Sequence, residues 1–299
     1  MLAAGTDRRG ALLVFGSAAV WSFGGAIARF LSVADSWTVI FWRSIAAAVF
    51  LVGFMLQREG WRGTRQLFAS MGLPGVGVAL CFATASTAFV VALAYTSVAN
   101  ILLMQAGAPL FAALMAFVLF GERASATTWV AIVAVMAGVA VMVSDSVAGR
   151  VSPIGDGLAL LISIAFSGAT VLTRRHAHVR MMPAVCLGTL IAATVAGALA
   201  SSMRVGVADA GLLLVFGALN LGLGMALFVT GVRLLPAAVA ALIGVAEPVL
   251  GPIWVWLVHG EIPSSRTLVG GSAVIVALLL HLGWQFRKHN QAPNAPLAD

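Results

Sequence analysis

Charged residues are scarce in this sequence. They make up 9% of its 299 residues, whereas about 25% is usual in a soluble globular domain. Hydrophobic residues reach 61%, and the mean hydropathy is +1.05. A chain of this composition has too little polar surface to fold as a soluble globule, and we therefore interpret it as an integral membrane protein.

Cysteine is rare as well. Only Cys81 and Cys186 are present, and both fall inside apolar runs. Cysteines in such surroundings pack as small hydrophobic side chains. The sequence therefore predicts neither a disulfide nor a metal site, and it offers no motif for a cofactor.

The residue patterns of several protein classes are missing. An intramembrane hydrolase needs a Ser/His pair, two membrane aspartates or a His-Glu-x-x-His motif, but every histidine lies at the end of an apolar run or between runs, and no aspartate lies mid-run. The Gly-x-x-x-x-Gly-Lys loop that binds ATP is absent. No ring of charges or filter indicates a passive channel. We expect neither an enzyme nor an ATP-driven pump.

Ten apolar stretches account for most of the chain. Each is close to the roughly 20 residues that a helix needs to cross a bilayer. They cover residues 11–32, 36–57, 69–95, 97–120, 126–144, 155–173, 183–203, 210–232, 237–258 and 266–286. Most of the 17 lysines and arginines lie between stretches on one side, which places both termini in the cytoplasm. The positive charge thus reflects orientation in the lipid bilayer and does not indicate a nucleic-acid partner.

A motif built on proline occurs twice, 139 positions apart. The shift aligns three pairs of residues: Pro109 with Pro248, Gly121 with Gly260, and Glu122 with Glu261. Nearer the start of each half, Trp21 aligns with Phe166 at an offset of 145. Each half has five stretches, and an odd number makes the second half enter the membrane from the opposite face.

We therefore predict an all-α integral membrane fold with ten transmembrane helices, arranged as two inverted five-helix repeats around a central cavity. The first repeat covers residues 10–144 and the second covers 155–286, with a linker at 145–154 and a disordered cytoplasmic tail at 287–299. Residues 57–65 are predicted to form a basic loop.

The repeated prolines predict two kinked helices. Proline removes one N–H donor and displaces the carbonyl four residues earlier, here that of Gln105 or Gly244. Lipid tolerates such carbonyls only where they face protein or a water-filled cavity. We expect a polar cavity near the bilayer midplane, with Pro109, Gly244 and Pro248 as the hinges of two gating helices.

Two charged residues lie inside the predicted spans. Arg43 is either a structural arginine that bonds nearby carbonyls or a ligand for a substrate carboxylate, since a cation in a span is costly unless it is paired or wet. Glu247 directly precedes the second kink proline. It is either a functional acid that receives an ammonium group or a structural acid held by hydrogen bonds.

The other candidates are polar, aromatic or thioether side chains in the same spans. Asn100, Met104 and Gln105 share one helix face and form either a pocket or interhelical contacts. Tyr95 is a cavity-mouth residue or a belt residue, and Trp254 is interpreted as a belt residue. The candidate substrate-binding residues are Trp21, Trp42, Arg43, Asn100, Met104, Gln105, Phe166, Asn220, Met225, Phe228 and Glu247.

The duplicated half, the proline and Gly-Glu matches and the arginine in the second span resemble the drug/metabolite transporter superfamily, in its EamA-type branch. Within this branch the chain is most similar to bacterial exporters of aromatic amino acids, the YddG type. The resemblance implies alternating-access export of aromatic and other neutral amino acids across the bacterial inner membrane. It calls for no obligate protein partner.

An exporter of cationic drugs or other small metabolites is the alternative within the same superfamily. Aromatic side chains beside one buried acid suit an organic cation equally well. The residues alone do not separate the two substrates.

Overall fold

The computed structural model describes residues 8–92, 94–95, 101, 105, 107–143, 153–260 and 265–290, and every regular element in them is a helix. The first half contains α1 (Arg8–Ser22), α2 (Gly24–Ala28), α3 (Ser36–Ser70), α4 (Gly72–Ala92), α6 (Ala108–Phe120) and α7 (Ala126–Val143). The second contains α8 (Pro153–Arg175), α9 (Met182–Leu199), α10 (Val207–Val215), the π-helix η1 (Phe216–Leu223), α11 (Gly224–Val232), α12 (Ala237–Gly244), α13 (Ala246–His259) and α14 (Ser265–Asn290).

Among the described residues, seven helical segments are long and apolar enough to cross a membrane. They are Arg8–Ala28, Ser36–Ser70, Gly72–Ala92, Pro153–Arg175, Met182–Leu199, Val207–Val232 and Ala237–His259. Three shorter apolar helices, Ala108–Phe120, Ala126–Gly138 and Leu268–His281, coincide with the remaining predicted stretches. The all-helical membrane fold is confirmed, while the number of ten crossings stays a prediction.

The Gly-Glu motif has a structural reason. Gly121 and Gly260 end α6 and α13 in the left-handed conformation, with φ of 69° and 70°. A side chain is disfavoured at such a φ, so glycine is the usual residue after a helix. Glu261 lies outside the described residues. The repeated glycine thus marks where each proline-containing helix stops.

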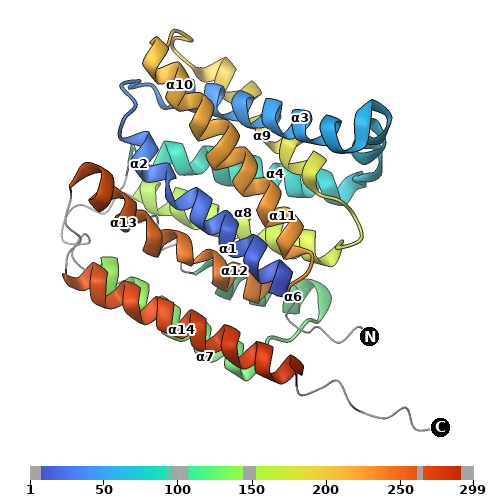
Figure 1. The fold of residues 1–299 in the computed structure, drawn as a ribbon, viewed down its shortest axis with the longest axis vertical. Coiled ribbons are helices and arrows are strands. Elements are labelled where there is room, and N and C mark those ends of the chain that lie inside the picture. The colour runs from blue at the N-terminus through green and yellow to red at the C-terminus, as the bar shows by residue number, and fades with distance from the viewer. Residues whose placement is uncertain are drawn as a thin grey trace.

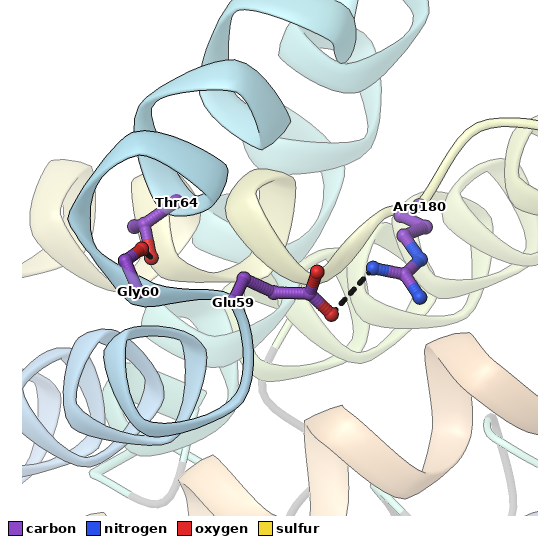
Figure 2. Close-up of polar contacts among 4 residues, drawn as sticks. All are labelled: Glu59, Gly60, Thr64 and Arg180. Atoms are coloured by element: carbon purple, nitrogen blue, oxygen red, sulfur yellow. Dashed lines mark hydrogen bonds and ion pairs between the residues drawn. The ribbon is translucent and has the colours of Figure 1, made fainter.

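The prediction of a basic loop at 57–65 is wrong. α3 continues to Ser70 and is interrupted only at Gly60, where φ is +67°. The Thr64 hydroxyl donates to the Gly60 carbonyl at 2.8 Å and restarts the helix (Figure 2). The charged residues suggested a loop, but a single left-handed glycine redirects a helix without ending it.

The packing of the helices has a two-part pattern. α1 packs along α11 as α8 packs along α4, and α3 packs on η1 as α9 packs on α4. If the spans of the two halves are paired in chain order, α1 is equivalent to α8, α3 to α9, and α4 to the span that contains η1 and α11. The α1–α11 contact then corresponds to the α8–α4 contact, and the α3–η1 contact corresponds to the α9–α4 contact. Helices paired in this way also contact each other, namely α3 with α9, α6 with α12, and α7 with α14, the last pair lying side by side in Figure 1.

The antiparallel pair α3 and α9 is connected at both ends. At one end Asp35 caps α3 and accepts hydrogen bonds from the Ser201 N–H and hydroxyl, both at 3.0 Å. At the other end Arg180, just before α9, forms a 2.6 Å ion pair with Glu59 (Figure 2). Both contacts link the two sequence halves.

A second aspartate strengthens the end that contains Asp35. Asp209, in α10, accepts hydrogen bonds from the Ser32 N–H at 3.0 Å and the Ser32 hydroxyl at 2.5 Å. The two loops, 29–35 and 200–206, therefore hold each other in place and line a cleft of about 340 Å³. Burial alone raises the pKa of the Asp35 carboxyl, but its hydrogen bonds from Ser201, Thr38 and Trp37 outweigh this and lower the pKa below 3.8.

Candidate functional site

Three interrupted helices meet in the bundle. The first span breaks at Phe23, between α1 and α2, and the ninth breaks at Val245, between α12 and α13. The eighth span contains the π-helical segment η1. α1 contacts η1, α12 and α13, and Figure 1 shows it between α11 and α13. Broken and π-helical segments are typical of binding sites in membrane transporters.

Asn220 bonds the backbone where the first span breaks. Its side-chain amide, on η1, donates to the carbonyls of Val20 at 2.6 Å and Trp21 at 3.3 Å. These carbonyls lie at the end of α1, where intrahelical donors run out. The contact explains a buried amide in this span without a substrate, so substrate binding by Asn220 stays a prediction.

An aromatic cluster lies beside this break. Trp21 contacts Phe166 at 5.9 Å and Phe228 at 5.4 Å between ring centroids, and Phe166 contacts Phe228 at 4.9 Å. Phe82 from α4 meets both phenylalanines edge-on. The structure thus brings together three predicted residues, two of which, Trp21 and Phe166, are paired by the repeat alignment.

Two rings of the cluster are buried and two are partly exposed. Phe82 and Phe228 are almost fully buried, and Met225 packs in the same core. Trp21 and Phe166 are partly exposed, and no acceptor pairs with the buried Trp21 indole N–H among the described residues. Sequence reasoning missed Phe82, since nothing local distinguishes it from Phe89 in the same span.

Arg43 is a buried cation with no carboxylate beside it in the part of the chain that the structure describes. Its side chain is 4% exposed and donates from Nη2 to the Ser86 hydroxyl at 2.6 Å and the Ser86 carbonyl at 3.3 Å. The guanidinium lies 5.0 Å from the ring centroid of Phe216, and its Nε has no acceptor among the residues that the structure describes. Such a group retains unused capacity to bind an anion.

Glu247 is the predicted acid of the ninth span. It lies in the first turn of α13, is partly exposed, and has neither a hydrogen bond nor an ion pair within the described residues. Glu247, Gly251 and Trp254 are spaced to share one helix face. Trp254 donates to the Ser22 hydroxyl at 2.7 Å, and Gly251 lies against the Ser22 carbonyl. Glu247 is therefore on the face of α13 that meets α1.

Trp254, predicted to be a belt residue, contacts the first span, and its place relative to lipid stays a prediction. Its indole stacks on the Phe23 ring, with 4.2 Å between the ring centroids, at the break between α1 and α2. Next along α13, a ring nitrogen of His259 lies 3.1 Å from the Ala26 carbonyl. The second half thus holds both pieces of the broken first span.

Several predicted residues lie elsewhere. The Trp42 indole donates to the Met203 carbonyl at 3.2 Å and packs in a separate core near the loop 200–206, so it does not join the aromatic cluster. Tyr95 is 48% exposed in the turn after α4. Gln105 is partly exposed, whereas Asn100 and Met104 fall outside the described residues.

The predicted hinges coincide with real helix ends. Pro109 is buried at the start of α6, where the Ser167 hydroxyl donates to the Ala108 carbonyl at 2.9 Å. Gly244 is the last residue of α12, and Pro248 is buried in the first turn of α13. Whether these positions move stays a prediction. No group of three potential metal ligands occurs among the described residues.

Known proteins provide two findings. The EamA-like transporter family matches residues 8–144 and 153–283. A solved structure described only as "Crystal structure of protein" has a TM-score of 0.76 and 18% identity, covering 91% of this chain and 96% of its own. At this identity the likeness shows the fold alone. No curated protein sequence matches the chain.

Proposed function

Because this chain belongs to the EamA-like transporter family and is a multi-pass membrane protein, we propose that it exports neutral amino acids, including aromatic ones, from the cytoplasm. The proposed site comprises Arg43, Glu247 and the aromatic cluster of Trp21, Phe82, Phe166 and Phe228. We further propose that the protein resides in the bacterial inner membrane with both termini cytoplasmic.

The observation that carries this proposal is the buried guanidinium of Arg43, which has no carboxylate beside it among the described residues. A cation removed from water without a counter-ion is costly, and a bound carboxylate offsets that cost. Glu247 is free for the ammonium group of the same zwitterion. The partly exposed rings of Trp21 and Phe166 offer an apolar surface to an aromatic or thioether side chain.

Arg43 also separates the two substrate classes. An organic cation would satisfy Glu247 and the aromatic rings but would leave the guanidinium without a counter-ion. A zwitterion satisfies both charges. For this reason we favour an amino acid over a cationic drug, although both remain distinct outcomes of the experiment below.

Alternating access follows from two inverted repeats, 10–144 and 155–286. The exchangeable packing of α1 on α11 and α8 on α4, together with the family match in two segments, supports this arrangement. The breaks at Val245 and before Pro109 serve as the hinges. When each repeat adopts the conformation of the other, the site changes from being open to one side of the membrane to being open to the other side.

The test measures uptake of labelled phenylalanine, threonine and methionine into liposomes that contain the purified protein. We expect saturable uptake that Arg43→Gln abolishes and Glu247→Gln weakens, while Arg204→Gln, at an exposed arginine, leaves it unchanged. A cationic dye is added as competitor. Uptake of the dye without any amino-acid signal, or full activity of Arg43→Gln, would overturn the proposal.

A further inference from the structure

The segment that follows Gly60 forms a short helix fixed to the bundle along one side. The Thr64 hydroxyl donates to the Gly60 carbonyl (Figure 2). Leu67 and Phe68 pack against the main core. Thr64, Leu67 and Phe68 recur at helical spacing, so one face of residues 61–70 is directed inward. The orientation of the remaining surface of this helix is therefore set by the fold.

The exposed surface beside that inward face combines one tryptophan with arginines. Trp61 is 75% exposed, the most exposed of the tryptophans. Arg62 and Arg65 are exposed on the same helix, and Arg58 is exposed just before the break, with its guanidinium 5.5 Å from the ring centroid of Phe54. We call Arg58, Trp61, Arg62 and Arg65 the arginine–tryptophan face.

The face keeps its positive charge. Glu59 is the only acid in residues 57–73, and it already forms the ion pair with Arg180 at 2.6 Å. Arg58, Arg62 and Arg65 have no ion pair within the described part of the chain. Three uncompensated guanidinium groups are thus available to an anionic partner.

The position along α3 points to the partner. At about 1.5 Å per residue the helix from Ser36 to Glu59 rises about 36 Å, which exceeds the roughly 30 Å of bilayer hydrocarbon. Gly60 therefore falls at the level of the lipid headgroups. Tryptophan is enriched at that depth, and arginine binds phosphate oxygens with paired N–H groups.

We infer that residues 61–70 form an interfacial helix whose arginine–tryptophan face docks on the anionic phospholipid headgroups of the adjacent leaflet. The indole lies among the headgroups, while the three guanidinium groups contact lipid phosphates. This interaction is independent of the transported substrate, so it stands or falls separately from the proposed function.

Quenching by brominated lipids tests the inference on the full-length protein. The signal of Trp61 is the difference between the wild-type protein and Trp61→Phe, in vesicles of phosphatidylcholine with brominated phosphatidylglycerol or brominated phosphatidylcholine. We expect stronger quenching by the anionic lipid. Arg58→Gln/Arg62→Gln/Arg65→Gln should lose this preference, because each arginine near an anionic surface is worth roughly fivefold in affinity.

Two controls accompany this measurement. The signal of Trp256, obtained with Trp256→Phe, reports the opposite end of the bundle and should show no preference. Thermal unfolding of the triple variant should match the wild-type protein, because all three side chains are exposed. Higher ionic strength should reduce the preference, since the Debye length falls from about 10 Å at 0.1 M to about 3 Å at 1 M.

Three results would overturn the inference. Equal quenching of Trp61 by the two lipids would show contact without charge selection. A preference that survives in the triple variant would assign it to other groups. Absence of quenching by either lipid would place Trp61 in water and leave the face to a soluble acidic partner.

Discussion

Gly217 makes one of the tightest helix contacts among the described residues and provides a sharp test of the packing. A Cβ at this position would lie 2.2 Å from the Arg43 carbonyl oxygen and 2.5 Å from the Ala46 Cβ. Ordinary contacts begin at 3.4 Å, so Gly217→Ala must push η1 and α3 apart by about an ångström. The neighbours are backbone and Cβ atoms, which have no rotamer to change.

We expect Gly217→Ala to destabilise the protein by about 1–3 kcal/mol, which corresponds to a fall of roughly 2–8 °C in the unfolding temperature. The variant also displaces the backbone of Arg43, so uptake of amino acids should fall with it. Thermal unfolding in detergent and liposome uptake measure the two effects on the same preparation.

Gly211→Ala is the matched control. It lies six residues earlier in the same span, and a Cβ there would meet nothing within 4 Å. Alanine is favoured over glycine in a helix by about 1 kcal/mol, so this variant should unfold at the wild-type temperature or above it. If Gly217→Ala behaved like Gly211→Ala, the close approach of η1 to α3 would be refuted.

Three further perturbations address other contacts. Asn220→Ala removes the donor to the Val20 and Trp21 carbonyls and should cost about 1–3 kcal/mol in thermal unfolding, with no rescue by Asn220→Asp, which lacks the N–H groups. Phe228→Ala should cost about 3–5 kcal/mol by opening a cavity in the aromatic cluster, whereas Phe228→Leu should recover most of it; equal unfolding temperatures would contradict the packing. Because the pKa of Asp35 is lowered below 3.8, its contribution is present at neutral pH and is lost as the pH falls through the folded-state pKa. Unfolding temperatures across pH 2–6 should therefore decline less steeply at the acid end in Asp35→Asn than in the wild-type protein.

The regular features of the fold could be predicted from the sequence. Apolar runs of spanning length identified the helices, and the shift of 139 found Gly121 and Gly260 as equivalent helix ends. The offset of 145 aligned Trp21 with Phe166, which are in contact. These features depend on hydrophobicity and on local backbone geometry, which a sequence records directly.

The partners of individual polar groups could not be predicted. Asn220, Trp42 and Trp254 all bond backbone or side-chain atoms from distant parts of the sequence, and no local pattern specifies such partners. Ser86, which holds Arg43, was one of several hydroxyls in its span. The break at Gly60 was hidden because charged residues around a glycine are typical of both a loop and an interfacial helix.

The connections at both ends of α3 and α9 have a mechanical consequence. Two helices connected at one end can move apart at the other end, but two helices connected at both ends move together. Asp35 with Ser201 and Glu59 with Arg180 provide the two joints. We therefore expect any rocking of this molecule to take place around this pair, at the breaks at Val245 and before Pro109.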